Sequence, residues 1–540
     1  MKITAFQHLF LKKQEVLWQI IHSYFLYWVI SFFEPFTMRQ ILLFGAGKSS
    51  TALINYFLVR AEEEAWHLTV ADASETSIRE KTGDSPHASA IALDITESKG
   101  RKALIQKADI VISLLPAALH HLVAKDCLLL KKNLLTASYV DDAIREMKEE
   151  IKNSNLLFLC EMGLDPGIDH MSAKRMIDAI HAEGGKITSF YSHCGGLVAP
   201  ESDDNPWHYK ISWNPRNVVT AGKSGAIFKK NGAIQELEYE DLFEEKRYVM
   251  VPGSEPLCWY PNRDSLSYIP KYGLEETGTF IRTTLRHPDF MYGWKNLIDL
   301  ALTDETKVYS TKGKTLQQIF KEHLDSIGFG EWLEEKLHNQ FDATKSLLSE
   351  LVNLVNLEEE AAKKGIDQVE EFMLVDDKGD LKNVDIDDLK INAAATLADK
   401  MHDANLTLKQ LFFLGLDDDK TVLKKEQATM ADVLQFCLES KLKLDPADKD
   451  MIVMLHELEY EKDGTEYKTT GLLHLKGDDS VHTAMSKTVG LPLATATKLI
   501  LNGTITSTGL QIPIGRDIYE PVLKELEAEG IFFTEETKAL

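Results

Sequence analysis

Residues 163–170, Gly-Leu-Asp-Pro-Gly-Ile-Asp-His, carry the residue types best suited to chemistry in this chain. Two carboxylates and an imidazole lie beside two glycines and a proline, which set an unusual backbone path. An apolar run at 156–160 precedes the segment, and residues 171–182 have helical spacing, so we expect a strand-to-helix loop. Enzymes with α/β folds place catalytic groups in such loops. The alternative is a plain connector in which Asp165 or Asp169 caps the helix.

A glycine-rich segment is the second motif. Gly45-Ala46-Gly47-Lys48-Ser49-Ser50 follows an apolar run at 39–44 and precedes a helical stretch. Gly45 allows a tight turn, Gly47 allows a pyrophosphate to approach the backbone, and the helix N-terminus favours negative charge. The spacing of an ATP-binding P-loop is absent. We therefore expect a dinucleotide at this loop.

Asp72 ends the next apolar run, residues 67–71. A carboxylate at this place accepts hydrogen bonds from the ribose 2′-hydroxyl of NAD and repels the 2′-phosphate of NADP. The neighbours Ala73 and Ser74 carry no positive charge. The sequence therefore predicts NAD as the cofactor and makes NADP the second choice. The alternative for Asp72 is a turn aspartate.

Six apolar runs alternate with helical segments, at 39–44, 67–71, 89–93, 110–114, 133–137 and 156–160. This alternation predicts an α/β fold with a Rossmann-type, doubly wound parallel sheet. After residue 186 the β-type segments lengthen, and a hairpin is expected across 451–475, turning at Asp463-Gly464. These features predict a second α/β domain with an open mixed sheet. Residues 316–444 look helical, with one apolar face through Leu347, Leu351 and Leu354.

Bulk composition limits the partners and the compartment. The 540 residues are too many for one core, so two or three domains are expected. The net charge of −24 argues against nucleic acid or an anionic membrane as a partner. The five cysteines form no C-x-x-C pair, which predicts a reducing compartment, the cytoplasm, and no metal site.

The first 37 residues are unusual because positions 16–33 are almost wholly apolar. That length approaches a membrane span. A dispensable or spurious extension ahead of Met38 is the favoured interpretation, because a nucleotide-binding strand begins directly after that residue. A buried or interfacial helix and a true membrane anchor are the alternatives.

Three further motifs reveal a family resemblance. They are residues 193–207 (His-Cys-Gly-Gly-Leu-Val-Ala-Pro-Glu-Ser-Asp-Asp-Asn-Pro-Trp), 210–216 (Lys-Ile-Ser-Trp-Asn-Pro-Arg) and 260–265 (Tyr-Pro-Asn-Arg-Asp-Ser). With the 163–170 loop they closely resemble the saccharopine dehydrogenase family, in its glutamate-forming branch. The resemblance implies a nucleotide domain at 38–165 plus about 480–540, a substrate-binding and dimerisation domain at 166–315 plus 445–479, and a helical insertion at 316–444. It also implies a homodimer.

The resemblance implies the site residues as well. Those implied for the cofactor, beside the glycine-rich loop and Asp72, are Leu93, Asp94, Ser113, Leu114 and Pro116. Those implied for the substrate are Ser138, Leu164, Asp165, Trp213, Arg263, Thr284, Leu285 and Arg286. The two arginines suit a substrate with three carboxylates, because a guanidinium binds a carboxylate with two hydrogen bonds. The alternative for either is a surface ion pair.

The implied reaction belongs to lysine metabolism. Saccharopine, a small molecule, is oxidised at its C–N bond by NAD to give glutamate and 2-aminoadipate 6-semialdehyde. This chemistry requires a general acid/base, and Asp165 is the first candidate, ahead of Tyr139 and Cys194. His170 can equally be a structural histidine, and Cys194 a small packing residue. The rival functions are a related oxidoreductase such as carboxynorspermidine dehydrogenase and a non-catalytic, membrane-attached dinucleotide-binding protein.

Overall fold

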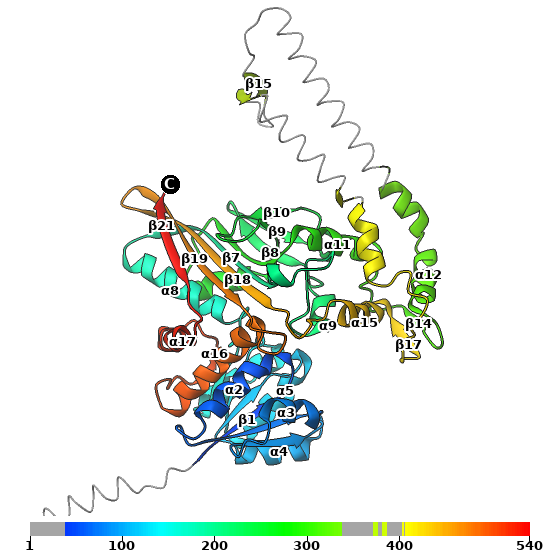
Figure 1. Cartoon of the computed structure of the whole chain (residues 1–540). Coiled ribbons are helices and arrows are strands. Elements are labelled where there is room, and N and C mark those ends of the chain that lie inside the picture. Colours follow the sequence, from blue (N-terminus) through cyan, green and yellow to red (C-terminus); the bar gives the residue numbers. More distant parts are fainter. Residues whose placement is uncertain (1–37, 337, 339–370, 376–380, 386–401, 404) are drawn as a thin grey trace, which may run out of the picture.

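The computed structural model describes residues 38–336, 338, 371–375, 381–385, 402, 403 and 405–540 (Figure 1). The predictions for residues 1–37 and for the apolar helix face through Leu347, Leu351 and Leu354 lie outside these ranges. Within the described ranges, no helix has both the length and the apolar character needed to cross a membrane.

The first sheet has seven strands in the order β20-β6-β5-β4-β1-β2-β3, and every neighbouring pair is parallel. Its strands are β1 (Arg39–Phe44), β2 (Trp66–Asp72), β3 (Ala88–Ala92), β4 (Ile110–Ser113), β5 (Asn133–Thr136), β6 (Leu157–Leu159) and β20 (Gly509–Gln511). The intervening helices are α2 (Thr51–Arg60), α3 (Glu75–Thr82), α4 (Ser98–Lys107), α5 (His120–Leu130), α6 (Asp142–Glu146) and α7 (Lys148–Asn153). The predicted parallel Rossmann-type sheet is confirmed.

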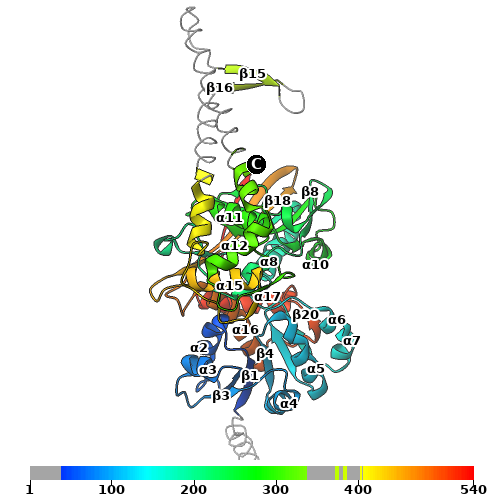
Figure 2. The ribbon, with the colours of Figure 1, turned by 90° about the vertical axis from the view of Figure 1, so that its right-hand side faces the viewer.

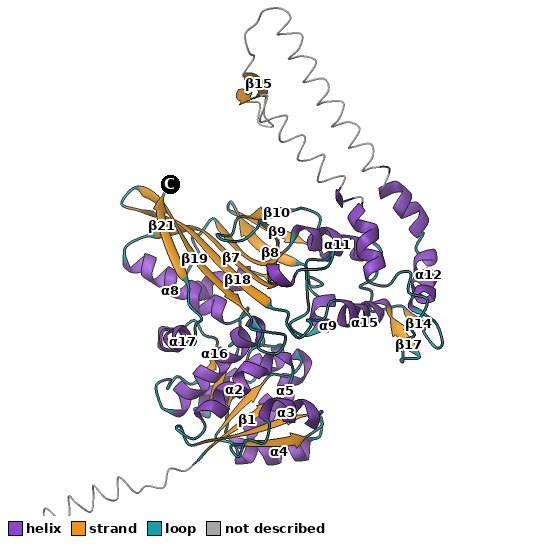
Figure 3. Cartoon of the chain, in the orientation of Figure 1, coloured by secondary structure: helices purple, strands orange, loops and turns teal. Residues whose placement is uncertain are grey.

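Side chains of β1 explain why helices cover both faces of this sheet. Ile41 and Leu43 pack in one core with α2, whereas Leu42 and Phe44 pack in another with α4 and α5. A strand buried on both faces must be apolar at successive positions, as β1 is from Ile41 to Phe44. Figure 3 shows the helices placed around these strands in the lower part of the molecule.

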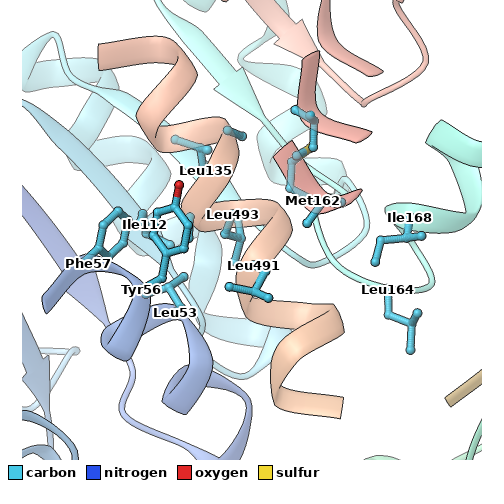
Figure 4. Close-up of a cluster of buried hydrophobic side chains, with 14 of the residues drawn as sticks. Leu53, Tyr56, Phe57, Ile112, Leu135, Met162, Leu164, Ile168, Leu491 and Leu493 are labelled. Atoms are coloured by element: carbon cyan, nitrogen blue, oxygen red, sulfur yellow. The ribbon is translucent and has the colours of Figure 1, made fainter. Parts of the chain in front are cut away.

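The chain returns to the first domain near its C-terminus. Helix α16 (Ala484–Leu501) packs on α2, and Figure 4 shows Leu491 and Leu493 of α16 near Leu53 and Tyr56 of α2. Helix α17 (Arg516–Ala528) packs on α16. The last strand, β21 (Thr534–Ala539), instead pairs with the second sheet. The boundary predicted at about 480–540 therefore includes a strand that belongs to the other sheet.

The second sheet is mixed, as predicted, with the main order β10-β11-β13-β7-β18-β19-β21. Strands β7 (Lys186–Val198) and β13 (Thr279–Arg286) pair in parallel, and the other neighbours on this path are antiparallel. The remaining bounds are β8 (Ala226–Lys230), β9 (Ala233–Leu237), β10 (Arg247–Val249), β11 (Leu257–Pro261), β12 (Arg263–Asp264), β18 (Asp450–Lys462) and β19 (Thr465–Lys476). Helix α8 (Ile168–Ala182) packs on β7 and on α17.

The predicted hairpin joins β18 to β19. Asp463 and Gly464 at its turn both have positive φ, 52° and 77°, as a two-residue type I′ hairpin turn requires.

The insertion differs from the prediction of a helical region. Described parts of it include α12 (Leu316–Ser326), α15 (Met430–Lys441) and β17 (Gln427–Thr429), which pairs with β14 (Val308–Ser310). It also contains a hairpin of β15 (Glu371–Val375) and β16 (Leu381–Asp385), which lies above the two domains in the view of Figure 2. The apolar run Phe372–Val375 in β15 is typical of a strand.

Candidate active site

The loop predicted from residues 163–170 connects β6 to α8. The Gly163 amide donates to the Pro166 carbonyl oxygen at 2.9 Å, and the Ile168 amide donates to the Gly163 carbonyl at 2.9 Å. Gly167 has a φ of 147°, and a Cβ there would lie 2.1 Å from the Gly163 oxygen. This turn therefore requires glycine. Figure 4 shows Leu164 in the loop and Ile168 at the start of α8. Both side chains belong to the hydrophobic core that β1 and α2 also share.

Asp165 lies in a largely buried network, with its side chain 12% exposed. Its Oδ1 accepts from Arg282 Nη2 at 2.6 Å and from the Tyr139 hydroxyl at 3.2 Å, and its Oδ2 accepts from Asn262 Nδ2 at 3.4 Å. Burial raises the pKa of Asp165, although the Arg282 guanidinium opposes that shift. A carboxyl group with a raised pKa is suited to proton exchange nearer neutral pH.

Neither aspartate of the loop caps α8. The N-cap is Gly167, and no side chain accepts from the first turn. Asp169 Oδ1 instead accepts from the Gly167 amide at 2.6 Å, and its Oδ2 accepts from Arg282 at 2.8 Å. Burial acts to raise the pKa of Asp169, but His170 and Arg282 outweigh it and lower the pKa. Asp169 therefore holds the turn, and the helix-cap interpretation of this loop is wrong.

Arg282 was missed by the sequence reasoning. It is fully buried on β13, and its guanidinium lies 4.5 Å from the centre of the Tyr268 ring. Its Nη2 donates hydrogen bonds to both Asp165 and Asp169, and this shared donor holds the two carboxylates close together. The sequence did contain a signal for Arg282, because an arginine inside an apolar strand, four residues before Arg286, is unusual.

His170 has both ring nitrogens occupied. Nε2 lies 2.8 Å from Glu161 Oε2, and Nδ1 lies 2.6 Å from the Tyr272 hydroxyl. Glu161 also accepts from Tyr268 at 3.0 Å. These contacts match the structural alternative for His170, and Glu161 is a buried acid that the sequence reasoning did not single out.

Arg286 is buried, with 4% exposure, at the end of β13. Its guanidinium lies 5.3 Å from the ring centres of both Tyr209 and Phe290. Nη1 donates to the Leu285 carbonyl at 2.9 Å, and Nε has no partner. No carboxylate within the described ranges forms an ion pair with it. A buried cation without a counter-ion is costly, which favours an anionic ligand.

Arg263 is exposed and lies 5.3 Å from the centre of the Tyr139 ring. It likewise forms no ion pair with any described carboxylate, so the surface ion-pair alternative is wrong for both arginines as far as the described residues extend. Because the Tyr139 hydroxyl also donates to Asp165, Arg263 lies close to the hydrogen-bonded group of Asp165, Asp169 and Arg282.

Cys194 on β7 is paired in register with Thr284 on β13, next to Leu285. Burial raises the pKa of its thiol, with further contributions from the charges of Asp165 and Asp169. The thiol therefore stays protonated at neutral pH. It is buried in the main core, as the packing alternative expected.

The glycine-rich loop and Asp72 contact each other directly. Asp72 Oδ2 accepts from the Ala46 amide at 2.8 Å, and Oδ1 accepts from the Ser74 amide at 2.9 Å. Gly45 has a φ of 105°, and a Cβ there would lie 2.6 Å from the Leu114 oxygen, so glycine is required. A Cβ at Gly47 would meet nothing within 4 Å, which leaves room for a phosphate group.

A hydrogen-bonded histidine connects the cofactor residues to the substrate residues. Ser113 Oγ lies 2.8 Å from His120 Nδ1, and His120 Nε2 lies 2.8 Å from Ser138 Oγ. Burial lowers the pKa of His120 to about 4, so the ring is neutral at physiological pH. His120 was not identified from the sequence, although it follows the Ser113–Pro116 segment by only a few residues.

The remaining predicted residues have the following positions. Lys48 Nζ donates to the Ile211 carbonyl at 3.3 Å, across to the second domain, and Trp213 Nε1 donates to the Tyr209 hydroxyl at 2.8 Å. The Leu93 amide donates to the Asp72 carbonyl at 2.9 Å. Asp94 is exposed and binds Thr96, and Pro116 precedes a short 3₁₀ turn.

Two protein-family models match this chain. A family model described as the saccharopine dehydrogenase C-terminal domain matches residues 163–531, and one described as the saccharopine dehydrogenase NADP binding domain matches residues 41–159. The chain belongs to the saccharopine dehydrogenase family. The first domain is accordingly a dinucleotide-binding domain.

Individual relatives cover nearly the whole chain. The chain is 32% identical over 509 residues to saccharopine dehydrogenase [NADP(+), L-glutamate-forming] of Saccharomyces cerevisiae, covering 93% of this chain and 100% of that protein. It is 33% identical to alpha-aminoadipic semialdehyde synthase of Arabidopsis thaliana, covering 89% of this chain and 42% of that protein. The solved apo saccharopine dehydrogenase (L-Glu forming) of S. cerevisiae matches with a TM-score of 0.71 at 29% identity, over 93% of this chain and 100% of that one.

Proposed function

We propose that this chain is an oxidoreductase acting on a CH–NH group, which oxidises the C–N bond of saccharopine to give L-glutamate and 2-aminoadipate 6-semialdehyde. This is a reaction of lysine metabolism. The observation that carries the proposal is a buried arginine, Arg286, which has no counter-ion among the described residues and lies on the strand whose Arg282 holds Asp165. Such a site has a place for a substrate carboxylate beside a group able to exchange protons. Three fungal relatives that align with more than 90% of this chain are named L-glutamate-forming saccharopine dehydrogenases, which supports the same reaction.

The chain's own residues have distinct parts in this proposal. Arg286 and Arg263 bind substrate carboxylates, and Asp165 accepts the proton of the substrate amine. Arg282 orients Asp165 through the 2.6 Å hydrogen bond. A dinucleotide held at the glycine-rich loop would supply the hydride acceptor for the C–N carbon, and water would then hydrolyse the resulting imine, which breaks the C–N bond and releases glutamate and the semialdehyde. Tyr139 and Cys194 are the second candidates for acid/base work, but burial raises the pKa of each and keeps both protonated.

The direct test uses the purified full chain with saccharopine and either dinucleotide, following the absorbance of the reduced nicotinamide. We expect turnover with saccharopine and none with carboxynorspermidine. Turnover with carboxynorspermidine alone would select the rival oxidoreductase, and turnover with neither would select the non-catalytic interpretation.

We further propose that NAD is preferred over NADP, which rests on the Asp72 carboxylate at the glycine-rich loop. Three fungal relatives carry NADP(+) in their names, so the comparisons do not support a preference for NAD. We expect kcat/KM to favour NAD by more than about tenfold, equivalent to ~1.4 kcal/mol. Steady-state kinetics with both cofactors measure it.

An equal or opposite preference would remove that role from Asp72. Attention would then turn to Lys81, whose Nζ donates to the Ala46 carbonyl at 2.8 Å and to Ser50 Oγ at 3.0 Å. Burial lowers the pKa of Lys81 to about 8. A Lys81→Met variant that loses NADP affinity and keeps NAD affinity would identify it as the phosphate-binding cation.

We propose that residues 1–37 are dispensable. Support comes from β1, which begins at Arg39 and is buried from Ile41 onwards. A chain starting at Met38 should have the melting temperature and the kcat of the full chain, measured by thermal unfolding and steady-state kinetics. Precipitation or loss of activity in the shortened chain alone would make the segment part of the fold or an anchor.

Two further proposals concern the assembly and the compartment. A homodimer is proposed on the family resemblance alone, and light scattering should give twice the chain mass. A cytoplasmic location is proposed because all five cysteines are free and buried, as suits a reducing compartment.

A further inference from the structure

A cluster of histidines and aspartates lies outside the residues assigned to the reaction. His208 lies in the loop before α9 (Pro215–Val219), and His287 and Asp289 lie at the start of α11 (Pro288–Asp299). One potential ligand atom from each of these three residues falls within 4.8 Å of the others. His208 Nε2 is 3.4 Å from Asp289 Oδ2, and the His208 and His287 rings stack with their centres 3.9 Å apart.

The surroundings of His208 orient it as a metal ligand. Its Nδ1 lies 2.6 Å from Asp203 Oδ2 and its Nε2 lies 3.4 Å from Asp289 Oδ2, so the ring stands between two carboxylates, and a metal ion on Nε2 takes the place of a proton there. A carboxylate on the far nitrogen is the usual support of a metal-binding histidine. The other oxygen of Asp203, Oδ1, is buried and has no hydrogen-bond partner among the described residues, which leaves part of its negative charge uncompensated.

A fourth donor is within reach. His402 Nε2 lies 2.9 Å from Asp289 Oδ2, and its side chain is 54% exposed and therefore able to adjust. The carboxylates of Asp203 and Asp289 supply negative charge that a divalent cation neutralises. Imidazole and carboxylate together favour Zn²⁺ or a similar transition metal over Ca²⁺ or Mg²⁺.

We propose that His208, His287 and Asp289 bind a divalent transition-metal ion, with His402 as the fourth donor. His287 must change most on binding, because its Nδ1 accepts from the Asp289 amide at 3.2 Å and its proton therefore lies on Nε2. The ion displaces either this long hydrogen bond or that proton. His287 directly follows Arg286, so a bound ion would brace the β13–α11 junction that positions the arginine.

This site was not predicted from the sequence, which pointed to no metal because the cysteines lack zinc spacing. The residues that form the cluster come from three separate segments of the chain. The inference does not depend on the proposed reaction, since the cluster contains none of the residues assigned to it.

The test is metal binding by the full chain. Purified protein is stripped with a chelator and then titrated with ZnCl₂ in a calorimeter, and Co²⁺ is used to follow ligand-field absorption. We expect one ion per chain and the intense visible bands of a four-coordinate Co²⁺ site. His208→Gln should abolish the bands, and Asp203→Asn should weaken affinity about 10- to 100-fold by removing the support of His208.

The matched control is His482→Gln, because His482 is an exposed histidine paired with an aspartate, Asp479, at 3.1 Å. This variant should bind Zn²⁺ like the unchanged chain. Circular dichroism of the stripped proteins checks folding, and Asp289→Asn replaces His208→Gln if the latter does not fold. Absence of binding by the unchanged chain, or equal binding by the His208 and Asp289 variants, would overturn the proposal and leave a proton-bridged His–Asp cluster.

Discussion

Replacing Asp165 by asparagine should lower kcat by about 10²–10⁴-fold while dinucleotide affinity survives. Asparagine has nearly the same size and can still contact Arg282 and Tyr139, so the turn that Gly167 and Asp169 maintain should persist. The substitution removes the one feature that matters to the proposal, an oxygen that can take and return a proton. Steady-state kinetics and cofactor binding by fluorescence measure the two quantities.

The pH profile gives an independent readout. Burial raises the pKa of Asp165 above the ordinary aspartate value, so the proton-accepting carboxylate is lost as the pH falls through that raised pKa. The kcat of the unchanged chain should therefore decline on the acidic side at a higher pH than an exposed aspartate would give. Asp165→Asn should lack this limb.

Tyr139→Phe and Cys194→Ser are the companion variants. Each should change kcat far less than Asp165→Asn does. If Asp165→Asn instead keeps near-normal kcat with an unchanged profile, Asp165 only orients the substrate, and the companion that loses activity becomes the acid/base.

Replacing Arg286 by alanine should cost about 2–4 kcal/mol of transition-state binding, since a buried charge-assisted contact with a substrate carboxylate is lost. This corresponds to a roughly 30- to 1000-fold fall in kcat/KM for saccharopine. The affinity for the dinucleotide should change little. Arg263→Ala should have a smaller effect, because Arg263 is exposed and solvent screens its charge.

Arg516→Ala is the matched control for charge removal, because Arg516 is an exposed arginine on α17 paired with Glu520. It should leave saccharopine kinetics unchanged. Normal kcat/KM in a folded Arg286→Ala protein would show that the buried guanidinium serves the packing against Tyr209 and Phe290 and not a substrate.

The sequence by itself predicted six of the seven strands of the first sheet and the β18–β19 hairpin of the second. The buried runs at β1, β4 and β5 are apolar at nearly every position, and that pattern specifies a strand covered on both faces. The Gly45 turn, the Gly167 turn and the Asp463-Gly464 hairpin could also be predicted, because the requirement for positive φ falls on one residue in each of the first two and on two adjacent residues in the hairpin. Asp165 could be singled out because the glycines and the proline beside it in the same loop restrict the backbone.

Tertiary structure alone decided which side chains meet. Arg282 reaches Asp165 and Asp169 only through the tertiary fold. Its strand, β13, pairs with β7 in the second sheet, whereas the two aspartates follow β6 of the first sheet. The same holds for His120 between Ser113 and Ser138, for β21 pairing with β19, and for the cluster of His208, His287 and Asp289. Local patterns encode the period of a strand or helix, but a hydrogen bond or ion pair depends on the distance between side chains that long-range strand pairing brings together. Arg286 is the clearest case, because the lack of a carboxylate partner among the described residues can be recognised only once the residues around the guanidinium have been placed.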